Sequence, residues 1–345
     1  MSIVSSDLAT APPRAGQVDG GVPSWRALVR WESALVVIFV GTLFFGAAES
    51  PHFLNHTNIF FIGLNMGEIA IMALPMTLIV MTGEIDLSVA AMLGLSSTML
   101  GYLYEHHWPV VLAMVAVLVI GAVGGAFNGF LVTKLGLPSI AVTIGTLALF
   151  RGIAEIVLGA NSVVKFPTGL TNIGVKPLPH TELSYSAVIF IVLAIVYGVI
   201  LHATPAGRSM IAIGLQSEAA FFAGIRVKRI KFILYTLSGV VCAFAGILWT
   251  YRLSSARYDN GLGLELDVVA IVLFGGISIF GGRGSIFGVV LAVAIFGSIK
   301  EALTLMNVSA QAQNIVTGGL LLISVILPNV AGSLRRVRAR AGLRT

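Results

Sequence analysis

The chain has 345 residues, of which 57% are hydrophobic and only 10% are charged, which excludes a water-soluble globule of this size. The formal net charge of +6 is explained by cationic loops on one side of a membrane, which disfavours nucleic-acid binding. The single cysteine, Cys242, lies in an apolar run, so neither an intramolecular disulfide nor a cysteine-based metal site is expected.

The chain begins with a polar segment, residues 1–32, rich in proline, glycine and serine, which predicts a disordered cytoplasmic tail. Arg26 and Arg30 precede the first apolar run, and this run ends in small residues, as a secretory signal does. We interpret the run as an uncleaved first span, because the two arginines already hold the N-terminus inside.

Apolar runs suited to crossing a bilayer recur along the rest of the chain, given that a spanning helix needs about 20 apolar residues. They cover residues 33–48, 58–82, 87–104, 109–133, 138–158, 185–202, 231–252, 266–280, 285–303 and 311–328. The predicted fold is an all-α, polytopic membrane helical bundle of about ten transmembrane helices with Gly-interrupted segments. The bundle spans residues 33–328 and is followed by a basic cytoplasmic tail, residues 329–345.

Two polar interruptions break the apolar pattern. The first, TGEIDLS at residues 82–88, carries two carboxylates and a serine placed to cap the next helix. The second, FGGISIFGGRGS at residues 274–285, adjoins a short span. Short, Gly-broken segments are typical of discontinuous helices along a transport pathway, and both fall on the predicted cytoplasmic side. The candidate path or gate residues here are Glu84, Asp86, Ser88, Gly275, Gly276, Gly281 and Gly282.

Some polar residues allow two interpretations. Asp86 can be stabilised by the start of a helix or can contact solute. Asn65, Thr143 and Thr146, all inside spans, can line a sugar path or join helices by hydrogen bonds.

Two features are expected on the outer side. Arg151 and Glu155 lie one helical turn apart and are predicted to pair, either at the interface or in a gate. The polar residues around Glu265 and Asp267, together with residues 159–184, form solvated loops or a docking surface for an external binding protein.

The longest polar interruption in the second half of the chain, residues 204–231, carries five cations against one carboxylate, Glu218, which predicts a cytoplasmic loop. Residues 211–222 have helical apolar spacing and small side chains near the end. They can dock on a cytoplasmic partner, or form an amphipathic helix lying on anionic headgroups.

Four segments carry a resemblance to ATP-binding-cassette importer permeases of the ribose/simple-sugar family, branched toward rhamnose or autoinducer-type permeases. GLQSEAAFFAGIRVKRIK is similar to the family's coupling loop, G-x-N-x-E-A-A-x-x-S-G-I-x-V-x-x-x-K. TGEIDLSVA is similar to T-G-G-I-D-L-S-V-G, with Glu84 in place of the second glycine. LPSIAVTIGTLALFRG and the segment from Glu265 to Val290 match two further motifs, and the likeness runs from about residue 30 to residue 328.

The resemblance implies a role for the loop in docking on the ATPase. Its matching residues are Gly214, Glu218, Ala219, Ala220, Gly224, Ile225, Val227 and Lys231. It also implies a cytoplasmic ATP-binding subunit, an extracytoplasmic solute-binding protein and a second permease chain, in the inner membrane of a bacterium with both termini cytoplasmic.

The absence of several sequence motifs disfavours some classes of function. The sequence has no G-x-x-x-x-G-K-[S/T] loop, no H-E-x-x-H motif and no catalytic constellation, so we expect no enzyme, no metal and no bound cofactor, and ATP and Mg would belong to the partner ATPase. The predicted function is import of a monosaccharide or similar small hydroxylated solute by alternating access. The alternative is an ion-gradient-driven secondary transporter, for which Glu84 and Asp86 are the only candidate buried charges.

Overall fold

The structure is a computed structural model that describes residues 25–324 and 326. Residues 1–24 of the predicted N-terminal tail and the whole predicted C-terminal tail lie outside the described residues. The labelled helices are α1 (Trp25–Glu49), α2 (His56–Met81), α3 (Val89–Glu105), α4 (Val110–Thr133), α5 (Ser139–Leu158), α6 (Thr168–Val175), α7 (Tyr185–Ala203), α8 (Pro205–Leu215), α9 (Ser217–Phe222), α10 (Val227–Leu253), α11 (Leu264–Phe274) and α12 (Ile286–Leu305). Residues 310–324 are also helical.

The described residues contain no β-strand, which confirms the predicted all-α class. Seven helices are long and apolar enough to cross a bilayer, namely α1, α2, α4, α5, α7, α10 and α12. The other three predicted spans correspond to α3 with 17 residues, α11 with 11 residues, and the helix at 310–324. The chain is therefore a polytopic helical bundle in which two short helices lie among long ones.

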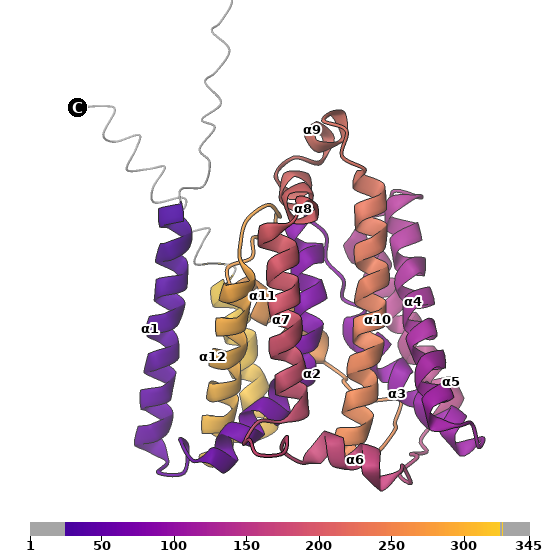
Figure 1. The fold of residues 1–345 in the computed structure, drawn as a ribbon, viewed down its shortest axis with the longest axis vertical. Coiled ribbons are helices and arrows are strands. Elements are labelled where there is room, and N and C mark those ends of the chain that lie inside the picture. Colours follow the sequence, from indigo (N-terminus) through magenta and orange to yellow (C-terminus); the bar gives the residue numbers. More distant parts are fainter. Residues whose placement is uncertain (1–24, 325, 327–345) are drawn as a thin grey trace, which may run out of the picture.

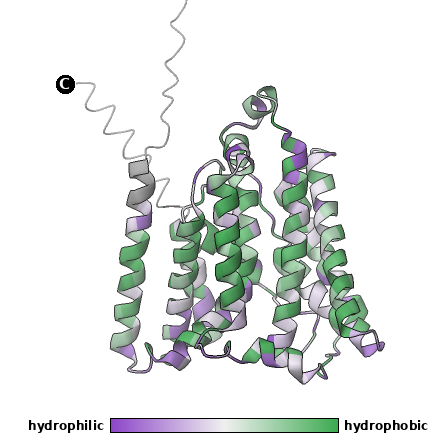
Figure 2. Cartoon of the chain, viewed as in Figure 1, coloured by the Kyte–Doolittle hydropathy of each residue, from purple (hydrophilic) through white to green (hydrophobic). Residues whose placement is uncertain are grey.

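The bundle has two polar ends. Figure 1 shows α8 and α9 at one end, called here the α8 end, and α6 at the opposite end, called the α6 end. Apolar residues run along the long helices between them, and polar residues gather towards the ends (Figure 2). The exposed residues of α4, α5 and α7 include many large apolar side chains, as expected of helices that face lipid.

Helix α2 forms the centre of the bundle, where it packs against α7, α10, α11 and α12. Every residue from Met66 to Met81 is buried, so α2 is enclosed by the rest of the protein around its whole circumference. The most extensive helix packing joins α4 to α10, where a Cβ atom on Gly239 would lie 2.1 Å from the carbonyl oxygen of Gly121. Small residues allow this backbone contact, which replaces the hydrophobic driving force that is missing between helices in lipid.

The short helix α11 follows an irregular segment, residues 254–263, that packs into the bundle beside the start of α3. Arg151 on α5 holds it, because its Nη1 atom donates to the carbonyl oxygens of Tyr258 and Asn260, each at 2.8 Å. Its Nη2 atom donates to the carbonyl oxygen of Ala90 at 3.3 Å. Among the ion pairs of the described residues none joins Arg151 to Glu155, so the predicted pair is wrong: backbone carbonyls occupy the guanidinium instead.

Candidate coupling and gate site

The loop predicted at residues 204–231 folds into a compact elbow at the α8 end. Thr204 starts α8 because its side-chain oxygen accepts a hydrogen bond from the Gly207 amide at 3.3 Å, and Pro205 occupies the first helical turn. After α9 the chain reverses at Gly224, whose φ of +84° is readily adopted only by glycine. A small apolar core of Ile213, Ala220 and Val227 closes the elbow.

The elbow meets both polar interruptions at one point, through Gly214 of α8. The Gly282 amide donates to the carbonyl oxygen of Met81 at 2.9 Å, which joins the second interruption to the end of α2. A Cβ atom on Gly214 would lie 2.0 Å from that same carbonyl oxygen and 2.3 Å from the Gly282 nitrogen. A Cβ atom on Gly281, at φ +82°, would lie 2.7 Å from the Gly83 nitrogen. Three segments far apart in sequence therefore touch backbone to backbone, and the two interruptions lie at the same end, as predicted.

Glu84 and Lys231 form an ion pair beside this contact. Lys231 lies in the first turns of α10, and its Nζ atom is 2.5 Å from Oε1 of Glu84. The side chain of Lys231 is only 14% exposed and that of Glu84 only 18%, so the pair lies largely within the protein. The ammonium group of Lys231 thus faces the 82–88 segment of its own chain.

Asp86 is buried and held by hydrogen bonds. Its Oδ1 atom accepts from the Ser88 amide at 3.0 Å and from the Ser88 hydroxyl at 2.6 Å, and its Oδ2 atom accepts from the Ser238 hydroxyl at 3.2 Å. Asn128 on α4 in turn donates to the Ser88 hydroxyl oxygen at 2.8 Å. No cation lies within ion-pair distance of Asp86 in the described part of the chain. These contacts favour stabilisation at the start of α3 over solute contact.

Ser88 occupies the cap position of α3 but does not cap it with its side chain. Its hydroxyl donates to Asp86, and no side-chain cap hydrogen bond forms. The predicted cap is therefore wrong, because the carboxylate two residues earlier is a stronger acceptor for that hydroxyl.

Thr143 and Thr146 are buried and bind backbone. The Thr143 hydroxyl donates to the carbonyl oxygen of Ser139 at 2.9 Å and lies 3.4 Å from that of Ile85. The Thr146 hydroxyl donates to the Thr143 carbonyl oxygen at 3.4 Å. The Ile85 amide donates to the Ser139 hydroxyl oxygen at 3.3 Å, so α5 fixes the 82–88 segment. Asn65 lies far from these residues, near the end of α10 that carries Arg252.

The coupling residues taken from the resemblance divide into two groups. Glu218, Ala219 and Gly224 are exposed, whereas Ala220 is buried in the elbow core and Ile225 packs against it. The structure adds exposed apolar residues that the sequence reasoning did not single out, namely Leu215, Phe221, Phe222 and Phe280. In the sequence, two adjacent phenylalanines, Phe221 and Phe222, within a cationic loop indicate such an exposed apolar surface. The side chains of these two residues are 64% and 85% exposed, at the tip of the molecule rather than along a spanning helix.

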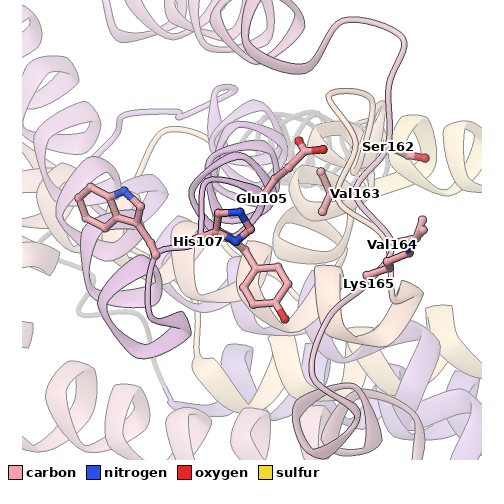
Figure 3. Close-up of a pocket in the computed structure, with 8 residues that line it drawn as sticks. Glu105, His107, Ser162, Val163, Val164 and Lys165 are labelled. Carbon is pink, nitrogen blue, oxygen red and sulfur yellow. The ribbon is translucent and has the colours of Figure 1, made fainter.

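The α6 end carries a groove of about 600 Å³. Its lining residues, drawn as sticks in Figure 3, come from two segments of the chain and are Tyr104, Glu105, His107, Trp108, Ser162, Val163, Val164 and Lys165. Val163 of this groove pairs with Ala256 in an antiparallel bridge. The next residue, Arg257, donates to both carboxylate oxygens of Asp259 at 2.8 and 2.7 Å, and these hydrogen bonds raise the pKa of the guanidinium. No group of three metal-ligating side chains occurs among the described residues.

Comparison with known proteins decides the family. Residues 58–325 match the family of permease components of the branched-chain amino acid transport system. The chain belongs to this permease family. It is 32% identical to the L-arabinose ABC transporter permease protein AraH of Azospirillum brasilense, over 96% of this chain and 95% of the relative. It is 31% identical to the autoinducer 2 import system permease protein LsrD of Photorhabdus temperata, over 86% and 90% of the two chains, and equally to LsrD of Escherichia coli.

The relatives are permease subunits of simple-sugar ABC importers, which confirms the resemblance seen in the motifs. This permease is accordingly a multi-pass transport subunit and not an enzyme. Nucleotide use in such importers belongs in general to a separate ATPase, and solute is delivered by a binding protein. No solved structure matches the chain.

Proposed function

We propose that this permease imports a monosaccharide or a similar small hydroxylated solute across the inner membrane of a bacterium, and that its elbow at residues 204–231 receives the motion of a cytoplasmic ATPase. The backbone contact of Gly214 with Met81 and Gly282 supports this most directly. Through that contact a displacement of α8 reaches both the end of α2 and the segment that precedes α12.

The orientation follows from charge. Arg208, Arg226, Lys228 and Arg229 all lie in or beside the elbow, and cationic loops stay on the cytoplasmic side. The α8 end is then inside and the α6 end is outside. In this orientation the groove at the α6 end lies where an extracytoplasmic binding protein would approach.

The docking surface is the exposed tip of the elbow. It consists of Glu218, Ala219, Phe221 and Phe222, with Leu215 and Phe280 near the contact point. Exposed aromatic residues are the common anchors of protein interfaces. Coupling requires that the ATPase bind the elbow differently in its open and closed states, because a contact of equal affinity in both would shift no population of the permease. The sequence has no G-x-x-x-x-G-K-[S/T] loop, so in this proposal ATP and Mg bind to the partner ATPase.

Co-purification tests the docking surface. We expect the Phe222→Glu variant to lose its cognate ATP-binding subunit in detergent, while Phe222→Leu keeps it, since leucine preserves the apolar contact without the ring. Both variants should insert and unfold like the unaltered permease, because the side chain is exposed. Undiminished capture of the ATPase by Phe222→Glu would refute the docking role.

Transport measurements test the solute. The Azospirillum relative carries arabinose in its name, so L-arabinose is the first probe, followed by D-ribose, D-xylose and autoinducer 2. Vesicles that contain the permease, its ATPase and its binding protein should accumulate one of these solutes only when ATP is present. Accumulation driven by an ion gradient with the ATPase omitted would instead support the secondary-transporter alternative.

A further inference from the structure

A second polar cluster lies near the α6 end, within the bundle. On α2, Glu68 is fully buried, and its Oε1 atom accepts a hydrogen bond from the Ser186 hydroxyl at 3.0 Å. Its Oε2 atom lies 3.3 Å from the Nε atom of Arg252, near the end of α10. The Arg252 guanidinium stacks 4.4 Å from the ring centroid of Trp249. Glu68, Arg252 and Trp249 therefore form a largely buried cluster around an ion pair that joins α2 to α10.

Asn65 forms the edge of this cluster. Its Oδ1 atom accepts from Nη1 of Arg252 at 3.3 Å, and its side chain is also a hydrogen-bond partner of the Glu301 carboxyl on α12. Asn65 is exposed, whereas Glu68 and Glu301 are buried. The asparagine thus connects a cation on one side of α2 with a carboxyl group on the other, and is the member of the cluster that opens to the outside of the chain.

This open edge cannot face lipid at low cost. Moving an amide without a compensating hydrogen bond into an apolar medium costs about 2–7 kcal/mol, depending on the reference state, and polar residues within a membrane normally face the bundle interior or a water-filled cavity. The lipid-facing positions of α4, α5 and α7 are by contrast large and apolar. The edge at Asn65 is consistent with an aqueous path.

Several polar atoms of the cluster are left without hydrogen bonds. Within the described part of the chain, Nε1 of Trp249 is buried and has no hydrogen-bond partner, while Oε2 of Glu68 and Nε of Arg252 face each other as an ion pair at 3.3 Å without forming a hydrogen bond. Native structures rarely leave a buried donor such as Nε1 of Trp249 unpaired, since this costs about 1–3 kcal/mol. A free donor beside an ion pair that lacks hydrogen bonds suits a ligand whose groups both donate and accept, and a hydroxyl group does both.

We propose that Asn65, Glu68, Trp249 and Arg252 form a recognition site for a neutral, polyhydroxylated solute at the outer mouth of the path. The hydroxyls of the solute enter beside Asn65 and complete the hydrogen bonds of Glu68, Arg252 and Trp249. A site built to bind hydroxyls selects against analogues that lack them, because its buried polar groups are then left unpaired. This inference rests on the proposed function and adds that the permease itself, beyond its binding protein, takes part in choosing the solute.

Cysteine accessibility tests the position of the edge. The only cysteine of the chain, Cys242, is buried, so an Asn65→Cys variant carries one reactive thiol. In the assembled importer we expect a membrane-impermeant methanethiosulfonate added outside to modify Asn65→Cys. It should leave Val123→Cys unmodified, because Val123 is a 64% exposed apolar position near the middle of α4 and therefore faces lipid. The transported sugar of the panel above should slow the modification. Absence of modification, or modification that no transported sugar slows, would overturn the proposal.

Glu68→Gln tests recognition separately. Glutamine keeps the shape and the hydrogen bond to Ser186 but removes the charge beside Arg252. We expect the KM for uptake to rise about tenfold with little change in kcat or in ATPase assembly. The matched control, Glu49→Gln, alters an exposed carboxylate at the end of α1 and should leave KM unchanged. An unchanged KM in Glu68→Gln would contradict the proposal.

The two hypotheses fail in different ways. If the unaltered importer transports no solute of the panel, the proposed function fails. If it transports one, but Asn65→Cys and Glu68→Gln behave like their controls, only the recognition site fails.

Discussion

The Nζ atom of Lys231 lies 2.5 Å from Oε1 of Glu84, which joins the base of α10 to the segment between α2 and α3. The family motif has glycine at the position of Glu84, so Glu84 adds a charge to this permease, and Lys231, the last residue of the coupling loop, pairs with that charge. The pair lies beside the backbone contact of Gly214, where the elbow meets the bundle.

The pair should behave as a unit. Removing one partner of a buried ion pair is more costly than removing both, because the remaining charge is left without compensation. We expect Lys231→Met to lower the midpoint of thermal unfolding more than the double variant Glu84→Gly/Lys231→Met. The coupling energy in a double-mutant cycle should be about 1 kcal/mol. Additive effects of the two substitutions would show that the pair contributes nothing.

Gly214 should be intolerant of any side chain. A Cβ atom there would lie 2.0 Å from the Met81 carbonyl oxygen, and backbone atoms cannot move aside as a flexible side chain can. We expect the Gly214→Ala variant to insert into the membrane and to bind its ATPase. Its rate of ATP-driven uptake should fall by about tenfold or more, because the added methyl group displaces α8 by about 1 Å and breaks the contact.

Gly145→Ala is the matched control, because a Cβ atom on Gly145 of α5 would meet nothing within 4 Å. Alanine in the interior of a helix stabilises it by about 0.5–1 kcal/mol relative to glycine, so uptake should be unchanged and the unfolding midpoint equal or higher. Normal uptake by Gly214→Ala would contradict a coupling role for the contact.

The parts of this site that could be predicted from the sequence are segments whose local composition differs from that of their neighbours. The acidic TGEIDLS segment, the glycine-rich segment and the cationic loop each stand out because each interrupts an apolar run. Their meeting at Gly214 could not be predicted, since it depends on contacts between residues more than 60 positions apart. The same holds for the pair of Glu84 and Lys231, which are 147 residues apart.

Helix lengths were harder to predict than helix existence. The predicted span 266–280 remains apolar beyond Phe274, but α11 ends there because Gly276 adopts a φ of +89° and turns the chain. The spacing of Arg151 and Glu155, one helical turn apart, predicts an ion pair between them. The real partners of Arg151 are the backbone carbonyls of a segment more than 100 residues away, and no pattern of side chains in the sequence marks backbone acceptors.

Asp86 should tolerate loss of its charge better than loss of its hydrogen bonds. Asparagine retains an oxygen that accepts from the Ser88 amide, and no cation among the described residues requires the carboxylate. We expect Asp86→Asn to cost about 1 kcal/mol and Asp86→Leu about 3 kcal/mol or more, because leucine leaves the amide and hydroxyl of Ser88 unpaired. The free energies follow from denaturation in detergent. A rise in KM for Asp86→Asn with unchanged stability would instead assign the residue to solute contact.

Arg151 should be required for the placement of residues 254–263, and lysine should not replace it. The planar guanidinium donates to three carbonyl oxygens from fixed directions, whereas an ammonium group is a compact charge without this fork. We expect Arg151→Lys to increase hydrogen exchange selectively in residues 254–263 and to lower stability by about 1–3 kcal/mol, since a hydrogen bond to a charged group contributes about that much. Glu155→Gln serves as the control, because Glu155 forms no ion pair with Arg151 and its substitution should leave exchange in this segment unchanged. Equal exchange in the two variants would mean that the segment keeps its place without the arginine.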